Sequence, residues 1–102
     1  MKIHHAPNTR SVRTVWLLEE LGIPYELEMH KLGDPAMRAP EYRKVHPMGR
    51  VPALEDGDVT VWDSQAILVY LARKFDSANK WLPVDAVGQA HVTQWLSFAA
   101  KE

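Results

Sequence analysis

Cysteine is absent from this chain of 102 residues. Its absence excludes structural disulfides, a Cys-x-x-Cys redox pair, a thiolate metal site and a cysteine nucleophile. Any thiol chemistry must therefore use a thiol that the ligand brings. An excess of charge of one sign is also lacking, because 12 basic and 13 acidic residues give a formal net charge of −1. This balance gives no reason to expect nucleic acid or an acidic membrane as a partner.

Long apolar runs are missing as well. The first residues, Met1 to His5, turn polar at once, and no apolar run approaches the roughly 20 residues of a membrane-spanning helix. We therefore expect no signal peptide, no membrane span and a cytoplasmic location. His4 and His5 point to opposite faces of a strand, and no His-x₃-His occurs. The sequence therefore predicts no metal site.

The first half of the chain carries alternating strand and helix signals. Residues 2–6 are typical of a strand, and Ser11 to Leu21 repeats apolar residues at helical spacing up to Gly22, a C-terminal cap. Apolar and polar residues alternate over 25–31, which predicts a second strand with one solvent-exposed face. The stretch 33–50 is predicted to be loop around a short helix near residues 41–45.

A hairpin and a helix are predicted to complete this domain. Residues 52–55 and 59–62 flank Asp56-Gly57-Asp58, a strong turn signal. From Ser64 to about Phe75 the apolar spacing is helical again. The order β-α-β-α-β-β-α predicts an α/β fold, with a mixed sheet and helices on its faces.

The C-terminal part shows a different pattern. We divide the chain into a domain at 1–78, a linker at 79–84 and a helix at 85–102 that Asp85 caps. An apolar stripe runs along this last helix and consists of Val92, Trp95, Leu96 and Ala99, with Phe98 close by. Such a stripe needs a packing partner. We expect the chain to be a fragment or another chain to cover the stripe; the alternative is that the helix folds back on the domain.

The stretch 46–67 holds the features that point to function. A proline within a strand belongs at an edge, at the first residue or at a bulge. If the bond between Val51 and Pro52 is cis, the N–H and C=O of Val51 face outward and can pair with an extended peptide. Asp63 and Ser64 stand at the start of a helix, where free N–H groups and the positive dipole end favour a carboxylate. A backbone clamp beside an anion site suits a small peptide acid.

Two motifs in this stretch resemble the glutathione-binding half of the cytosolic glutathione transferases. They are Gly49-Arg50-Val51-Pro52-Ala53-Leu54 and Asp63-Ser64-Gln65-Ala66-Ile67, where the family usually has Gly-Lys-Val-Pro-Ala-Leu and Glu-Ser-Gln/Arg-Ala-Ile. The resemblance covers nearly the whole chain. It implies a thioredoxin-like glutathione-binding domain followed by the first helix of a truncated all-α C-terminal domain. It also implies glutathione as co-substrate, a small electrophile as the second substrate, no further cofactor, and a homodimer when full length.

The resemblance also implies roles for single residues in binding glutathione. Val51, beside Pro52, holds the cysteinyl part through its backbone. Ser64 takes the γ-glutamyl carboxylate, while Asp63 pairs with the α-ammonium group. Arg50 stands near the glycyl end and adds charge for an anionic ligand. Taken singly, Ser64 is better explained as a helix N-cap and Arg50 as a solvated surface charge; their joint spacing around Val51 and Pro52 reverses that judgement.

Thr9, Asn8 and Ser11 are the candidates for the group that stabilises the thiolate. Lowering a thiol pKa from about 8.5 by two units requires about 2.7 kcal/mol. A hydroxyl at the entrance of the helix that begins at Ser11 is a plausible source. The resemblance aligns the serines of bacterial relatives with Thr9 and Ser11, and the Ala-Pro-Asn wording of another branch with Asn8. We rank Thr9 first, then Asn8, then Ser11; the alternative is that Thr9 or Asn8 simply caps the helix.

The leading interpretation is a glutathione transferase that conjugates glutathione to an electrophilic small molecule. One alternative is a glutathione-dependent disulfide or peroxide reductase, which the Ala6-Pro7-Asn8 wording favours. Another is a non-catalytic, transferase-like interaction domain.

Overall fold

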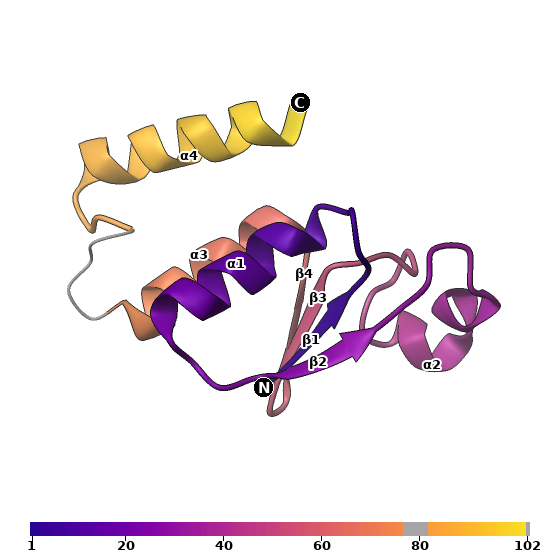
Figure 1. Cartoon of the computed structure of the whole chain (residues 1–102). Helices are drawn as coiled ribbons and strands as arrows, with labels where there is room; N and C mark the ends of the chain where they lie inside the picture. The colour runs from indigo at the N-terminus through magenta and orange to yellow at the C-terminus, as the bar shows by residue number, and fades with distance from the viewer. Residues whose placement is uncertain (77–81, 102) are drawn as a thin grey trace.

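A four-stranded mixed sheet forms the centre of the protein (Figure 1). The computed structural model describes residues 1–76 and 82–101. The strands are β1 (Lys2–His5), β2 (Glu26–Met29), β3 (Ala53–Asp56) and β4 (Val59–Trp62). Their order across the sheet is β2-β1-β3-β4, with β1 parallel to β2 and β3 antiparallel to β1 and β4. The predicted thioredoxin-like α/β class is confirmed.

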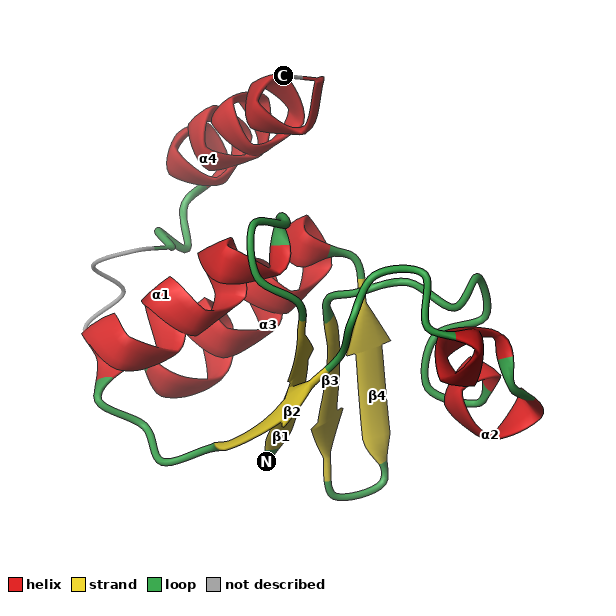
Figure 2. Ribbon diagram, turned by 45° about the vertical axis from the view of Figure 1, so that its right-hand side comes forward, coloured by secondary structure: helices red, strands yellow, loops and turns green. Residues whose placement is uncertain are grey.

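Helices lie on both sides of this sheet (Figure 2). Helices α1 (Ser11–Leu21) and α3 (Ser64–Phe75) pack on one face, and the short helices η1 (Pro35–Arg38) and α2 (Pro40–Arg43) lie on the other side. Helix α1 ends at Gly22 as predicted, because its φ of 68° suits a residue without a side chain. Helix α2 begins earlier than the predicted 41–45, since a proline suits the first helical position.

Five fully buried side chains hold the sheet against α1 and α3. They are Ile3, Leu18, Leu54, Ile67 and Leu71. Each contributes roughly 1.5–3 kcal/mol by leaving water. Because they come from β1, α1, β3 and α3 together, they fix the ends of these elements relative to one another.

Strand β2 departs from the sequence-based expectation. The alternating pattern over 25–31 predicts one buried face, yet all four residues of β2 are exposed, with Leu27 at 44% and Met29 at 53%. The strand is short and lies at the edge of the sheet, where it has only β1 as a neighbour. The prediction of a buried face was wrong because a period of two says nothing about what covers the strand.

Helix α4 (Ala86–Lys101) follows the sheet domain and meets it along one side. Val92 and Leu96 line an apolar cavity of about 220 Å³ together with side chains of α1 and α3. Asp85 caps the helix as predicted, accepting from the N–H of Gly88 at 2.9 Å. Trp95 and Phe98 remain 62% and 55% exposed. The stripe therefore meets the domain only in part.

The boundary predicted at residue 78, and residues 79–81 of the predicted linker 79–84, lie outside the described residues. Within the described parts of the chain, no helix is both long enough and apolar enough to cross a membrane.

Candidate functional site

Three separate segments of the chain meet at one edge of the sheet, namely the edge at which β1 and β4 end and β3 begins. The antiparallel register pairs His4, near the end of β1, with Ala53, the first residue of β3. Ala53 in turn pairs with Trp62, the last residue of β4. The loop after β1, the segment before β3 and the start of α3 therefore emerge side by side. These segments contain every residue that the sequence nominated for glutathione.

Two adjoining cavities of about 250 and 320 Å³ lie at this edge and share Arg50 and Val51. The first is lined by Arg10, His46, Met48, Arg50, Val51, Pro52, Trp62, Asp63 and Ser64. The second is lined by Thr9, Leu32, Gly33, Asp34, Met37, Arg38, Gly49, Arg50 and Val51. The structure thus brings together the predicted binding residues and Thr9, whereas Asn8 and Ser11 line neither cavity. Three arginines against two aspartates give this lining an excess of positive charge, which suits an anionic ligand.

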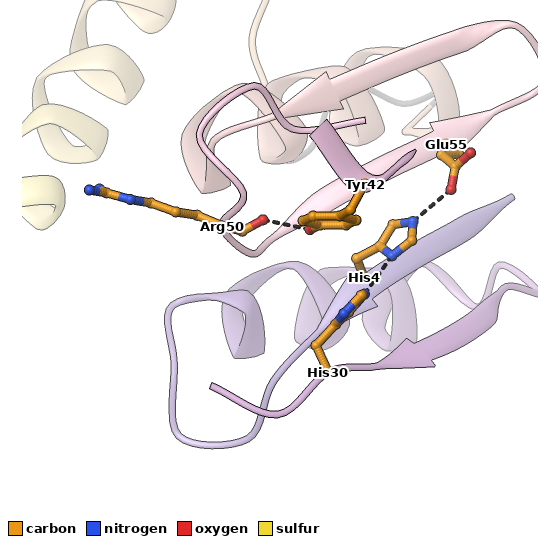
Figure 3. Close-up of polar contacts among 5 residues, drawn as sticks. All are labelled: His4, His30, Tyr42, Arg50 and Glu55. Carbon is orange, nitrogen blue, oxygen red and sulfur yellow. Dashed lines mark hydrogen bonds and ion pairs between the residues drawn. The ribbon is translucent and has the colours of Figure 1, made fainter. Parts of the chain in front are cut away.

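The segment before β3 presents its backbone to both cavities. The Val51–Pro52 peptide bond is cis, and Val51 is half-buried while Pro52 is buried. Within the described parts of the chain, neither the N–H nor the C=O of Val51 takes part in a main-chain hydrogen bond. The hydroxyl of Tyr42 donates to the carbonyl oxygen of Arg50 at 2.5 Å, one residue earlier (Figure 3). The segment is therefore held from one side and leaves the Val51 backbone available to a ligand.

Tyr42 packs against a partly buried network of polar rings, which Figure 3 shows. Its ring lies 5.2 Å from that of His4 and 4.8 Å from that of His30, between centroids. His4 donates through Nε2 to Glu55 at 2.6 Å, and its Nδ1 lies 2.8 Å from Nε2 of His30. Burial, aided by the charge of Glu55, raises the pKa of Tyr42 to about 12. The phenol therefore stays a hydrogen-bond donor at neutral pH.

The start of α3 forms the opposite wall. Asp63 is the N-cap residue and accepts from the N–H of Ala66 at 3.2 Å. The alternative that Ser64 is the N-cap was therefore wrong. Ser64 is the first helical residue, only 6% exposed, and lines the cavity. Its N–H is among those that no helical carbonyl can reach, because it lies in the first turn.

Backbone strain is concentrated at this edge of the sheet. In the described part of the chain, the non-glycine residues with positive φ are Asn8, at 60°, and Asp63, at 81°. Asparagine tolerates the left-handed region, but the conformation of Asp63 costs about 1–3 kcal/mol. Strain of this kind persists where the surrounding structure enforces it, and it clusters at ligand sites. The observation favours a functional role for this edge.

The loop after β1 holds the three candidates for the thiol partner. Thr9 is half-buried, Asn8 is exposed and Ser11 is fully buried. Arg10 directly precedes α1, but its side chain makes no capping hydrogen bond. Oγ1 of Thr9 accepts from the N–H of Ser11, the first helical residue, at 3.2 Å, so the alternative that Thr9 caps the helix is confirmed in part. The hydroxyl of Thr9 donates to the carbonyl oxygen of Ala6 at 2.7 Å and lies 2.5 Å from that of Ser11.

His46 is a site residue to which the sequence analysis gave no role. It is 4% exposed, lines the cavity beside Ser64, and accepts from the N–H of Met48 at 3.2 Å through Nδ1. Its ring lies 5.0 Å from that of Trp62. The only sequence signal was its position at the start of the motif stretch. Tyr42 was missed for a similar reason, because its contact with Arg50 joins two segments that the pattern treats separately.

The two partly desolvated histidines predict a pH-dependent stability. Burial lowers the pKa of His46, aided by the charge of Arg50, and burial lowers the pKa of His30, aided by His4. The unfolded chain therefore binds more protons just below the ordinary value of 6.5. We expect the free energy of unfolding to fall as the pH drops below that value, measured by urea unfolding.

A matched pair of variants isolates the contribution of His46. His46→Asn keeps an acceptor for Met48 without a titrating ring, so the fall should become shallower. His91→Asn, at an exposed position on α4, should keep the wild-type fall. An equal slope in all three proteins would contradict the assignment.

Among the residues that the structure describes, no group of three or more His, Cys, Asp or Glu side chains is arranged to hold a metal ion.

The fold and the site together define the class of this protein. A mixed four-stranded sheet carries a cis-proline segment next to a helix N-terminus, which is a thioredoxin-like binding domain. Residues 9–74 match the family described as "Glutathione S-transferase, N-terminal domain". The chain belongs to the glutathione S-transferase family.

Individual relatives support the same assignment. The chain is 37% identical over 97 residues to glutathione S-transferase 3 of Schizosaccharomyces pombe, covering 95% of this chain and 40% of that protein. An epsilon-class glutathione S-transferase from the housefly superimposes with a TM-score of 0.87 at 31% identity, over 97% of this chain and 46% of that one. Human glutathione transferase theta-2, solved in complex with glutathione, gives a TM-score of 0.83 at 29% identity, over 98% and 42%. The chain thus spans less than half the length of these relatives.

Proposed function

We propose that this protein is a glutathione transferase that binds glutathione, stabilises its thiolate and transfers it to an electrophilic small molecule. The observation that carries the proposal is the meeting of Val51 and Ser64 on one cavity, beside an arginine-rich wall. The backbone of Val51 pairs with the cysteinyl part, as an added strand does. Ser64, at the N-terminus of α3, donates to the γ-glutamyl carboxylate through its hydroxyl and N–H, and Asp63 pairs with the α-ammonium group.

The remaining charges of the site fit the other end of the ligand. Arg50 lines both cavities and supplies a positive charge for the glycyl carboxylate. Pro52 lines the first cavity beside Val51. This arrangement leaves the cysteine sulfur in the direction of Thr9, which lines the second cavity.

We assign the stabilisation of the thiolate to Thr9. Thr9 lies at the N-terminus of α1 and is among the residues that line the cavity shared with Val51. Ser11 is fully buried, and Asn8 is exposed outside the lining, which supports ranking Thr9 ahead of both. A donated hydrogen bond together with the helix dipole favours the anion. No metal or further cofactor is required, because proximity and anion stabilisation suffice.

The whole protein is expected to act as a cytoplasmic homodimer, and the second substrate to be a small electrophile. Relatives of this chain are more than twice its length. Residues beyond the described domain are therefore expected to form much of the electrophile pocket.

A comparison of two ligands tests the proposal. Glutathione and S-methylglutathione should bind the full-length protein with similar affinity in calorimetry, because both carry the same carboxylates and backbone. Only glutathione should be conjugated to an aromatic halide. Failure of both ligands to bind would overturn the proposal.

Two further outcomes separate the alternative functions. Turnover of a disulfide substrate without conjugation would favour a reductase, which the exposed Asn8 at positive φ makes worth assaying. Tight binding of glutathione without turnover of any thiol substrate would favour a non-catalytic interaction domain.

A further inference from the structure

A line of three hydrogen-bonding side chains ends at Thr9. Nδ1 of His5 lies 2.7 Å from Oγ of Ser11. The same Oγ lies 2.5 Å from Oγ1 of Thr9. Ser11 is fully buried and His5 is half-buried, while Thr9 reaches the cavity. The line therefore runs from the end of β1, through the interior, to the proposed thiol site.

A count of protons shows what this line requires. The line continues from Thr9 to the carbonyl oxygen of Ala6 at 2.7 Å, so it contains three short hydrogen bonds. A carbonyl oxygen only accepts, and each hydroxyl supplies a single proton. Two hydroxyl protons cannot serve three hydrogen bonds. The third proton must come from Nδ1 of His5.

The other contacts of Ser11 do not remove this shortage. Its hydroxyl also lies 3.1 Å from the carbonyl oxygen of Ala6, and it accepts from the N–H of Ala6 at 3.2 Å. Giving the Ser11 proton to that carbonyl would leave the short contact with Thr9 without a proton, and the contact with His5 would still need one from Nδ1. The short contacts are satisfied together only when His5 donates.

We propose that His5 is a positioning residue for thiol stabilisation, donating from Nδ1 to Ser11, which donates to Thr9. This inference rests on the proposed role of Thr9. When glutathione binds, the Thr9 hydroxyl turns its proton from the carbonyl of Ala6 to the sulfur. Because Ser11 still donates to Thr9, the Thr9 hydroxyl is polarised and becomes a stronger donor to the thiolate. No covalent bond forms or breaks, and every proton stays on its own heavy atom.

Two substitutions at His5 test the proposal. His5→Phe keeps a ring of similar size but removes the donor, whereas His5→Asn keeps an N–H at the position of Nδ1. The readout is the pKa of the bound glutathione thiol, from the ultraviolet absorbance of the thiolate as the pH is varied. We expect His5→Phe to raise this pKa by about one unit, which is about tenfold less thiolate at a pH below it. His5→Asn should retain the wild-type value, and the affinity for S-methylglutathione should change little in either variant.

A double variant distinguishes a connected line from separate effects. Ser11→Ala removes the middle member, so it should raise the thiol pKa about as much as His5→Phe does. Combining both substitutions should add nothing further, because either one already interrupts the line. Thermal unfolding of each variant checks that the fold is retained.

The possible results separate this inference from the proposed function. If glutathione binds His5→Phe with an unchanged thiol pKa, or if His5→Asn shifts it as much as His5→Phe, the role of His5 is refuted while the transferase proposal stands. Additive shifts in the double variant would also refute the line. If Thr9→Ala leaves the thiol pKa unchanged, the role of Thr9 fails and the inference fails with it.

Discussion

Replacing Gly49 with alanine is expected to destabilise the protein by about 3 kcal/mol or more. Gly49 has a φ of +64°, which a residue with a side chain adopts only at a cost of roughly 1–2 kcal/mol. A Cβ at this position would also run into the backbone oxygen of Met37 and lie 3.3 Å from its carbonyl carbon. Backbone atoms cannot rotate away as a flexible side chain can, so overpacking adds about 1–3 kcal/mol.

Gly57 provides the matched control for this substitution. It has a φ of +60°, but a Cβ there would meet nothing within 4 Å. Gly57→Ala should therefore lose only the conformational part, about 1 kcal/mol. Urea unfolding of the three proteins measures the difference. Equal losses in the two variants would contradict the close approach of the chain at Met37.

The second large effect is expected at Ser64. Ser64→Ala should weaken glutathione binding by about 10- to 150-fold, because a hydrogen bond to a charged group contributes about 1.5–3 kcal/mol. The loss should be similar for S-methylglutathione, since the proposed partner of Ser64 is the carboxylate and not the sulfur. Calorimetry measures both affinities.

Ser97 serves as the control for this prediction. It lies exposed on α4, outside both cavities, so Ser97→Ala should leave glutathione affinity unchanged. Undiminished binding by Ser64→Ala would mean that the γ-glutamyl carboxylate is held elsewhere. The bounds of α3 make such a result informative, because Asp63, not Ser64, caps the helix.

Much of the fold could be predicted where local signals agree with the tertiary environment. Helix α1 has clear apolar spacing and a left-handed cap at Gly22, and its bounds were predicted correctly. The turn at Asp56-Gly57-Asp58 likewise fixed β4. The prediction of a buried face on β2 was wrong because alternation does not reveal whether a strand lies at an edge. The predicted start of α2 was one residue late because Pro40 was interpreted as a loop signal.

The site residues likewise divide into those that the sequence predicted and those that it did not. Val51 and Ser64 belong to contiguous motifs, so the sequence alone nominated them. Tyr42 and His46 act through contacts to residues several positions away, which only the folded backbone brings about. The order of preference among Thr9, Asn8 and Ser11 rested on the resemblance, whereas burial and the cavity lining depend on the path of one loop.

The meeting of three strand ends at one edge has a consequence for how such a protein can be redesigned. In the described part of the chain, no hydrogen bond joins the loop at residues 6–10 to the first turn of α3. Under the proposed function, the residue that stabilises the thiolate and the residue that binds the γ-glutamyl carboxylate thus lie on segments that these hydrogen bonds do not join. The loop at residues 6–10 could therefore be replaced by one that carries a different thiolate-stabilising group, without changing the residues proposed to bind the γ-glutamyl carboxylate.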